Sequence, residues 1–423
     1  MFSFPLIVLA FSLFSASIAS PSTPLSLHRR GSSSTPLPPS QDPWYTAPAD
    51  FESSAPGTIL RIRPVPGNLT SIIGNCSAAY NILFRSTNSR YAPTWGVTTL
   101  FVPQSTNSSS LLSYQIPYNT ADVDGSPSYA LYQGGFPDIP NALGLGWYVN
   151  VPDFEGPYAD FTAGVQEGHA TLDSVRAALH SEVGPGSKAR YALWGYSGGS
   201  LASEWAAELQ VQYAPELNIS GLAAGGVTTN LTDAFLYRIS GGPFAGLVPG
   251  GILGITKQWP EAYQYVLSRL KTSGPHNRTG FLQALNETYE QSAATFANQD
   301  IFDYFIGGRA DLEAPVLQKI YNSDAQMGYH GVPQTPMFFY KAIADELVLT
   351  NFTTIQVERY CQLGANILYQ LNTVGGHLDE YTNGVPRAFA WLSSVFDGTY
   401  AEKYPDQGCT TQTVSVNITD TGL

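Results

Sequence analysis

Charged side chains are scarce in this chain of 423 residues: Asp, Glu, Lys and Arg make up 13% of it, against ~25% in typical soluble domains. Positive charge is the scarcer sign, because 20 Lys and Arg stand against 33 Asp and Glu, which gives a formal net charge of −13. A protein that binds nucleic acid needs positive charge to neutralise phosphates. We therefore expect no nucleic-acid partner.

Long hydrophobic runs are absent after the N-terminus, because Gly, Pro or polar residues interrupt every candidate for a membrane span. Residues 1–19 are apolar, but Ser3, Ser12 and Ser15 interrupt them and they end at small residues. This pattern is typical of a cleaved secretory signal rather than a membrane anchor. We predict a signal peptide over 1–19 and a secreted, extracellular protein without a transmembrane anchor.

A Ser/Pro-rich segment follows at residues 20–43 and contains the dibasic pair Arg29-Arg30. Its composition predicts either a disordered tail or a short pro-segment that is removed at the dibasic pair. The composition alone does not separate these two alternatives.

Cysteine is also scarce, and the three cysteines can form one disulfide and leave one thiol in an oxidising compartment. Cys361 and Cys409 are the closer pair in sequence and are predicted to be joined. Cys76 is then either a buried free thiol or a nucleophile. It has no histidine nearby in sequence and lies inside an Asn-x-Ser/Thr sequon, so a catalytic role is the weaker alternative.

Acceptor sites for N-linked glycan are abundant, which fits a secreted protein whose surface has few charges. The sequons place predicted glycosylation at Asn68, Asn75, Asn107, Asn218, Asn230, Asn277, Asn286, Asn351 and Asn417.

Strand and helix patterns alternate in the first half of the chain. Residues 146–153 and 191–194 resemble short buried strands, and helices are predicted over 162–179 and 199–213. Strand, helix, strand, helix is typical of a mostly parallel sheet flanked by helices. We predict an α/β core whose first part is 44–227 and whose second part is 334–423, including a C-terminal tail.

The alternation stops between residues 228 and 333, where strand signals are weak and several helical stretches occur. A segment of this length without its own structure is uncommon in a compact domain. We predict that 228–333 is an inserted helical subdomain that covers the sheet as a lid.

The sharpest motif is Gly195-Tyr196-Ser197-Gly198-Gly199, a G-x-S-x-G between a predicted strand and a predicted helix. That context is typical of the nucleophile elbow, a tight turn that presents a serine hydroxyl at the end of a strand. We predict that Ser197 is a catalytic nucleophile and that the backbone N–H of Gly198 binds the oxyanion. A glycine-rich turn with a capping serine is the structural alternative.

The serine needs a base and an acid, which follow it in this fold in the order Ser, Asp or Glu, His. This order leaves His377, in Gly375-Gly376-His377, as the predicted base. The acid should follow the preceding strand, where Asp345 is predicted and Glu346 is its near rival. Asp379 and Glu380 are close to the histidine in sequence but poorly placed to reach back to its ring.

The chain resembles the fungal secretory lipase family, of the α/β-hydrolase superfamily, over roughly residues 40–410. The residues that carry the resemblance are Asp153-Phe-Glu-Gly156, Gly195–Gly199, Tyr213–Ile219, Gly241–Gly246, Ala344–Glu346, Gly364–Ile367 and Phe396–Gly398. The resemblance implies an α/β-hydrolase fold with a helical lid, and Ser197, Asp345 and His377 as the triad. It also implies Asp153 as the second oxyanion donor, through its backbone N–H helped by its carboxyl group.

These features predict a serine hydrolase of carboxylic esters that needs no metal and no cofactor. A triacylglycerol lipase is the first hypothesis, because the apolar run at residues 239–255 could expose an interfacial surface at an oil–water boundary. That run could instead be packed core. The alternative is an esterase or deacetylase of small soluble or secondary-metabolite esters; a peptidase and a non-catalytic binding protein are less supported.

Overall fold

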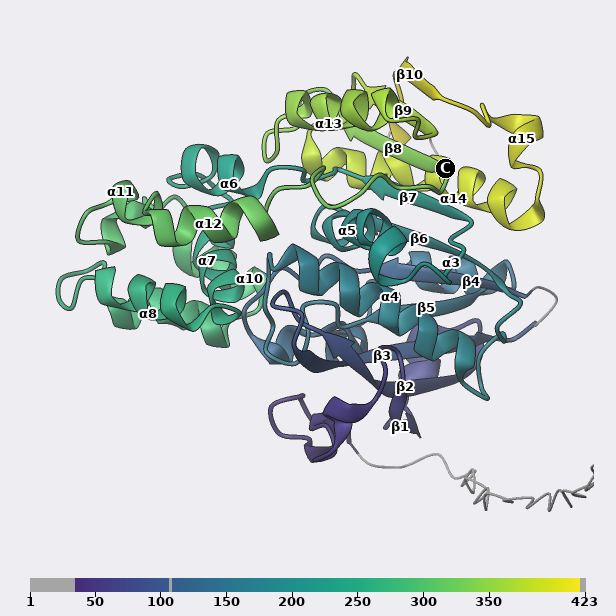
Figure 1. Cartoon of the computed structure of the whole chain (residues 1–423), viewed down its shortest axis with the longest axis horizontal. Coiled ribbons are helices and arrows are strands. Elements are labelled where there is room, and N and C mark those ends of the chain that lie inside the picture. The colour runs from purple at the N-terminus through teal and green to yellow at the C-terminus, as the bar shows by residue number, and fades with distance from the viewer. Residues whose placement is uncertain (1–34, 106–108, 419–423) are drawn as a thin grey trace, which may run out of the picture. The chain divides into compact units, whose positions relative to one another are not determined.

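A ten-stranded sheet organises the chain, whose computed structural model describes residues 35–105 and 109–418. The strand order is β1-β2-β3-β5-β4-β6-β7-β8-β9-β10 (Figure 1). The predicted signal peptide and the sequon at Asn107 lie outside the described residues. The strands are β1 (Ile59–Pro64), β2 (Cys76–Thr87), β3 (Pro93–Pro103), β4 (Ser110–Gln115), β5 (Tyr148–Pro152), β6 (Arg190–Tyr196), β7 (Gly221–Gly225), β8 (Met337–Ala342), β9 (Ile367–Asn372) and β10 (Cys409–Val414).

The sheet is antiparallel at one edge and parallel elsewhere. β1, β2, β3 and β5 pair antiparallel, whereas β5 and every later neighbour pair in parallel through to β10. All residues of β4 and β8 are buried, as expected for parallel strands covered on both faces. The predicted α/β-hydrolase arrangement is therefore confirmed.

Helices cover both faces of the sheet and bury a separate apolar core on each. On one face α4 (Gly164–His180), α5 (Gly198–Tyr213) and α13 (Thr350–Gln362) contribute to the larger cluster. On the other face α1 (Leu69–Ile73), α3 (Asp138–Gly144) and α14 (His377–Asp397) contribute to the second cluster. Two further short helices are α2 (Pro127–Ala130) and α15 (Tyr400–Lys403). No described helix has the length and apolarity needed to cross a membrane.

The segment between β7 and β8 is helical; we call it the lid after the prediction above, and its helices lie together at the left of Figure 1. They are α6 (Leu231–Asp233), α7 (Leu247–Lys257), α8 (Pro260–Arg269), α9 (Arg278–Phe281), α10 (Tyr289–Phe296), α11 (Arg309–Leu312) and α12 (Pro315–Asp324). The apolar side chains of 239–255 belong to the same buried cluster as α4 and α5. The lid and the sheet therefore share one apolar core.

Two polar contacts across the boundary add to this packing. The Asp324 carboxylate on α12 accepts a hydrogen bond of 2.7 Å from the N–H of Val165, in the first turn of α4. The Lys257 ammonium at the end of α7 donates to the carbonyls of Ala121 and Tyr158 in the core, at 2.8 and 2.7 Å. These bonds hold the lid against loops at the edge of the sheet.

The prediction for residues 20–43 needs a correction at its described end, because residues 35–43 are tied to the core. The backbone N–H and the hydroxyl of Ser40 both donate to the Asp124 carboxylate, at 2.8 and 2.7 Å. Asp42 pairs with Arg63 of β1 at 2.8 Å. A Ser/Pro-rich composition predicts a solvated tail, but these polar residues meet charged partners from distant parts of the chain.

The C-terminal tail also differs from the prediction, because residues 409–414 form β10, an edge strand parallel to β9. The sequence there is polar and its side chains are mostly exposed, so it lacks the apolar run that reveals a buried strand.

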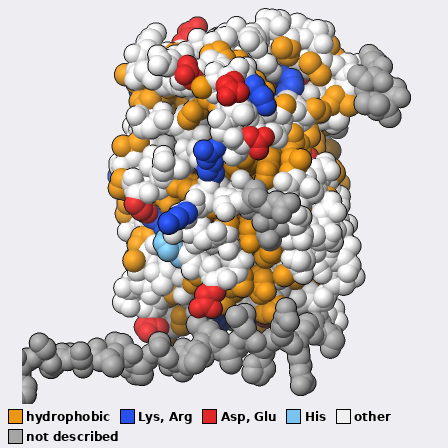
Figure 2. All heavy atoms as spheres, turned by 90° about the vertical axis from the view of Figure 1, so that its right-hand side faces the viewer, with side chains coloured by type: hydrophobic (Ala, Val, Ile, Leu, Met, Phe, Trp, Pro, Cys, Tyr) orange, Lys and Arg blue, Asp and Glu red, His pale blue; other side chains and the backbone are white. Residues whose placement is uncertain are grey.

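Figure 2 shows the face on the right of Figure 1, where the charged side chains are few among neutral and hydrophobic ones.

A disulfide joins Cys361, near the end of α13, to Cys409, at the start of β10, as predicted. The third cysteine, Cys76, is a buried free thiol at the start of β2. The disulfide closes a loop with a sequence separation of 48 residues. It therefore tethers the exposed edge strand to the body of the fold.

Replacing both Cys361 and Cys409 by alanine should lower the free energy of unfolding by about 4 kcal/mol, because a loop of this length restricts the unfolded chain. Chemical denaturation measures this loss. The matched control is Cys76→Ala, which keeps the disulfide and should cost about 1 kcal/mol. Peptide mapping without reduction should recover Cys76 as a thiol, and its recovery in a crosslink would contradict the pairing.

Candidate active site

The backbone makes a sharp turn at Ser197, between the end of β6 and the start of α5. Ser197 has φ +53° and ψ −120°, a backbone conformation that residues other than glycine rarely adopt. The neighbours on either side are crowded: a Cβ on Gly195 would lie 2.1 Å from the carbonyl oxygen of Gly199, and one on Gly199 would lie 1.9 Å from that of Gln115. Only glycine fits at these two positions, which explains the spacing of the motif.

Three predicted residues from distant parts of the chain meet at this turn. His377 Nε2 lies 2.9 Å from Ser197 Oγ, and His377 Nδ1 lies 2.8 Å from Asp345 Oδ2. Ser197 is partly exposed, whereas Asp345 and His377 are buried. The order hydroxyl, imidazole, carboxylate is the arrangement in which an imidazole can take a proton from serine while a carboxylate holds its tautomer.

The Asp345 carboxylate is fully hydrogen-bonded. Oδ2 accepts from Lys341 Nζ at 2.7 Å as well as lying against His377, and Oδ1 accepts from the N–H groups of Leu347 and Val348 at 3.0 and 2.9 Å. Burial alone would raise the pKa of this carboxyl, but the His377 hydrogen bond and the Lys341 charge outweigh it and hold the pKa well below its usual range. Asp345 is therefore ionised at neutral pH.

The neighbouring carboxylates have other partners. Glu346 accepts a hydrogen bond of 2.8 Å from the backbone N–H of His377, so it holds the main chain of the base rather than its ring. Asp379 accepts from the N–H of Gly376, and Glu380 accepts from Asn372 and from Arg387. None of these three carboxylates hydrogen-bonds the imidazole in the described part of the chain.

The donors for an oxyanion are only partly those predicted. Gly198 begins α5, so its N–H has no partner within the helix and lies next to the serine. The N–H of Asp153, by contrast, donates to the carbonyl of Val97 at 2.9 Å, and its carboxylate accepts from the N–H and hydroxyl of Ser128 at 2.8 and 2.6 Å. The amide of Asp153 is thus occupied, and the expectation that it binds the oxyanion does not hold in this arrangement.

Asp153 is nevertheless unusual, because burial raises the pKa of its carboxyl to about 7 in spite of the two hydrogen bonds from Ser128. The residue after it, Phe154, packs with Tyr118 against Ala202 of α5. Asp153 thus anchors the loop that supports the nucleophile helix rather than touching the serine.

Asn119 lies beside Gly198, a neighbour of the nucleophile that the sequence analysis missed. It lies in the loop after β4, has φ +47°, and its Oδ1 is so close to Gly198 that a Cβ there would lie 1.9 Å away. Oδ1 is buried and has no hydrogen-bond partner within the described residues. In this arrangement the carboxamide turns its acceptor toward Gly198, and only a half-turn that exchanges Oδ1 with Nδ2 would present a donor there.

Asn119 carries no motif of its own, so the signal for it is topological. β4 was not recognised as a strand in the sequence, although Leu111, Leu112 and Tyr114 are buried there. Since β4 is a direct neighbour of β6 in the sheet, the loop after it ends beside the loop that carries Ser197. Recognising β4 would have pointed to residues 116–122.

The remaining predicted positions can also be located. The described sequon asparagines are all exposed or partly exposed, so glycosylation there stays a prediction. Within residues 35–105 and 109–418, no three His, Cys, Asp or Glu side chains are grouped in a way that could hold a metal ion.

Comparisons with known proteins agree on one family. The family model described as secretory lipase matches residues 135–403. The chain is 48% identical to the trichothecene C-3 esterase of Fusarium sporotrichioides over 93% of this chain and 92% of that protein. It is 36% identical to lipase A of Arthroderma benhamiae over 92% of this chain and 85% of that protein.

Solved structures give the same result for the fold. The crystal structure of Candida antarctica lipase A in its closed state is similar to this chain with a TM-score of 0.81 and 28% identity. The similarity covers 90% of this chain and 91% of that one.

Substitution of each carboxylate distinguishes the two candidate acids, Asp345 and Glu346. Asp345→Asn should lower kcat by about 10⁴, because an amide facing Nδ1 favours the wrong imidazole tautomer. Glu346→Gln keeps an acceptor for the N–H of His377 and should cost far less. Steady-state rates on a soluble ester measure both, and a larger loss in Glu346→Gln would move the acid to that residue.

The oxyanion geometry predicts a contribution from Asn119. Asn119→Gly should lower kcat by about 10²–10³, as for loss of one oxyanion donor, and glycine tolerates the positive φ without strain. KM should change little, because the donor acts on the charge that develops in the transition state. Ser128→Ala is the control, since it unpairs Asp153 instead; equal losses in the two variants would contradict the assignment.

Proposed function

The chain belongs to the secretory lipase family and is a carboxylic ester hydrolase, and on that premise we propose that Ser197, His377 and Asp345 perform the hydrolysis through an acyl-enzyme. The observation that carries this proposal is the continuous chain of contacts from Ser197 Oγ through the imidazole to Asp345 Oδ2, at 2.9 and 2.8 Å. A serine hydroxyl is a weak nucleophile unless an adjacent base removes its proton, and the imidazole is within reach of that proton.

In the first half of the reaction, Ser197 Oγ attacks the ester carbonyl carbon while its proton passes to His377 Nε2. The oxyanion that forms is bound by the N–H of Gly198 and, once the Asn119 carboxamide has turned to present its Nδ2, by the N–H of that side chain. Asp345 stabilises the imidazolium without taking its proton. When the intermediate collapses, the imidazolium protonates the leaving alcohol and the acyl group stays on the serine.

In the second half, water replaces the alcohol. His377 Nε2 takes a proton from the water, whose oxygen attacks the acyl carbon, and the same two donors bind the second oxyanion. Collapse returns the proton to Ser197 Oγ and releases the carboxylic acid. The cycle balances with water as the one co-reactant.

We propose that the substrate is a small soluble ester, with a short acyl group on a larger alcohol, rather than an emulsified triacylglycerol. The apolar run 239–255 is buried in the common core and offers little free surface: Leu247, Ile252 and Ile255 are at most 5% exposed. A lid that acts at an oil surface must present apolar side chains when it opens. Exposing this run would require breaking the core itself.

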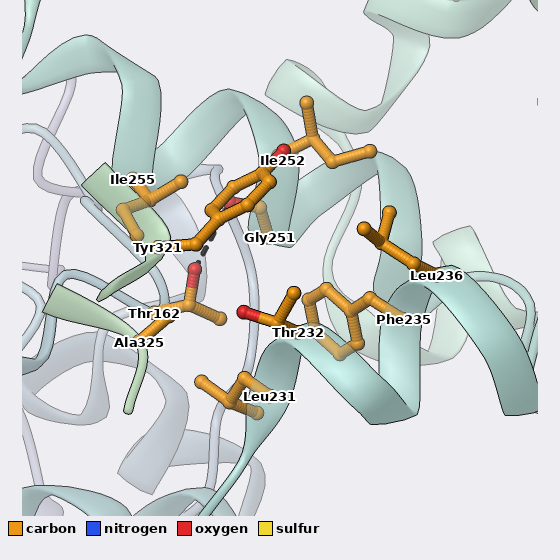
Figure 3. Close-up of a pocket in the computed structure, with 10 residues that line it drawn as sticks. All are labelled: Thr162, Leu231, Thr232, Phe235, Leu236, Gly251, Ile252, Ile255, Tyr321 and Ala325. Carbon is orange, nitrogen blue, oxygen red and sulfur yellow. Dashed lines mark hydrogen bonds between the residues drawn. The ribbon is translucent and has the colours of Figure 1, made fainter. Parts of the chain in front are cut away.

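An apolar pocket lies within the lid, away from the triad (Figure 3). Phe235, Leu236, Gly251, Ile252, Ile255 and Tyr321 line it, and Thr162 donates a hydrogen bond of 3.0 Å to the carbonyl of Gly251. None of its lining residues is Ser197, Asp345 or His377. This pocket therefore does not hold the acyl group of an ester bound at Ser197 in the described arrangement.

The names of relatives support the same choice in part. Two similar proteins, at 48% and 43% identity, are named as a trichothecene C-3 esterase and a probable trichothecene esterase.

Triacylglycerol lipase is the second candidate, because two apolar side chains close in sequence to the acid and the base could meet lipid. They are Ile343 and Leu378, which are 48% and 62% exposed. We also propose that the enzyme acts outside the cell, since the leader pattern and the secretory family agree.

Substrate preference tests this proposal directly. The value of kcat/KM should fall at least about tenfold from p-nitrophenyl acetate to the palmitate ester, and the rate should not rise when substrate passes from monomer to emulsion. Ser197→Ala is the control for background hydrolysis. A rate on emulsified triacylglycerol that exceeds the rate on soluble acetate esters would favour the lipase instead.

A further inference from the structure

A lysine is buried beside the candidate acid, in a place where the proposed reaction gives it no role. Lys341 lies in β8, four residues before Asp345, and both side chains are 0% exposed. Its ammonium donates to Asp345 Oδ2 at 2.7 Å and to the carbonyl of Val227 at 3.3 Å. Lysine is almost never fully buried unless it is paired, so this position requires an explanation.

Lys341 and His377 share one oxygen of the acid. Oδ2 of Asp345 contacts both the ammonium and the imidazole Nδ1, while Oδ1 is held by two backbone N–H groups. Donors on both oxygens leave the carboxylate little freedom to rotate. The imidazole therefore meets an acceptor of fixed direction, which fixes its own orientation toward Ser197.

The ammonium also changes the charge that the imidazole experiences. In a Ser-His-Asp arrangement the carboxylate charge stabilises the imidazolium, but here a positive charge lies on the same oxygen. Burial lowers the pKa of Lys341, and the Asp345 charge opposes that effect and keeps the pair ionic. A cation next to a carboxylate offsets part of the negative field that the carboxylate exerts on the imidazole.

Other titratable groups around the site do not supply this charge. Glu346 contacts the backbone N–H of His377, and the Tyr196 hydroxyl from β6 donates to the His377 carbonyl. Glu380 of α14 is paired with Arg387, and Tyr369 of β9 hydrogen-bonds Thr354. Within the described residues, no other Lys or Arg forms an ion pair with Asp345.

We propose that Lys341 is a positioning residue that fixes the Asp345 carboxylate and, by its charge, extends the activity of the triad to lower pH. This inference rests on the proposed roles of Ser197, Asp345 and His377. It adds to them that the acidic limit of activity is set by the pair Lys341–Asp345 and not by Asp345 alone.

The test compares pH profiles of Lys341→Met and Lys341→Gln with the natural protein. Methionine removes charge and hydrogen bond at similar length, whereas glutamine keeps a donor for Asp345 without the charge. For both variants the acidic limb of kcat/KM on p-nitrophenyl acetate should move to higher pH by about 1 unit or more. The loss of kcat above that limb should be smaller for Lys341→Gln than for Lys341→Met.

A second readout avoids the later steps of turnover. The rate at which a p-nitrophenyl phosphonate modifies Ser197 depends on the neutral imidazole but not on deacylation. Its acidic limb should move by the same amount as that of kcat/KM.

Thr353→Val is the matched control, because Thr353 is buried and donates 3.1 Å to the same Val227 carbonyl as Lys341. It disturbs the local packing without changing a charge and should leave the acidic limb in place. If Lys341 is only a structural residue, its variants should lose thermal stability while the limb stays at its natural pH. That result in either folded, active variant would overturn the proposal.

The natural protein in the same assay separates this inference from the proposed function. Absence of hydrolysis and of phosphonate modification in the natural chain would contradict the proposed function. If the natural chain is fully active and the acidic limb of the pH profile does not move in the Lys341 variants, only the proposal for Lys341 is contradicted. The proposed function then stands.

Discussion

The left-handed backbone of Ser197 is the constraint on which the rest of this site depends. A residue other than glycine held there costs about 1–3 kcal/mol, so the surrounding fold must hold it in place. It does so through close packing: Gly195 and Gly199 bring strand, turn and helix within contact, and the Gln115 carbonyl of β4 closes on Gly199. A parallel sheet with β6 between β4 and β7 is what makes this packing possible.

The same topology explains how distant residues meet the serine. Each of these residues follows a strand of the sheet: Asn119 follows β4, Ser197 follows β6, Asp345 follows β8 and His377 follows β9. The carboxyl ends of parallel strands share one edge of a sheet. Which side chains meet at this edge therefore depends on how the strands pair in the sheet as much as on the residue types. Four donors also fix the orientation of the Asp345 carboxylate. A carboxylate that is hydrogen-bonded on both oxygens cannot turn away from the imidazole.

The lid shapes the choice of substrate through its packing. Its apolar run belongs to the core that covers α4 and α5, and polar bonds from Asp324 and Lys257 cross the same boundary. Burying apolar surface stabilises by roughly 25 cal/mol per Å², so lifting the whole lid would cost much of the stability of a domain. A small ester could enter by displacing a few side chains, which costs far less free energy than the lid opening that contact with an oil droplet requires.

Much of this could be predicted from the sequence, because strong local signals coincide with chemistry. The G-x-S-x-G turn, the strand and helix alternation around it, and a histidine in a glycine-rich loop identify Ser197 and His377. The place of Asn119 beside Gly198 could not be predicted, since it comes from the adjacency of β4 and β6. The sequence motif of Asp153 also does not reveal that Val97 and Ser128 occupy its polar groups in this arrangement. Lys341 is likewise indistinguishable in sequence from any strand residue.

The central claim is that ester hydrolysis passes through an acyl group on Ser197, and trapping that intermediate tests it most directly. The enzyme would be mixed with p-nitrophenyl acetate, quenched in acid within the first turnover, digested and analysed by mass spectrometry. The account predicts one acetyl group on the peptide that contains Ser197, formed together with a burst of p-nitrophenol of one equivalent per enzyme. Turnover without that acetyl group, or an acetyl group on a different peptide, would contradict it.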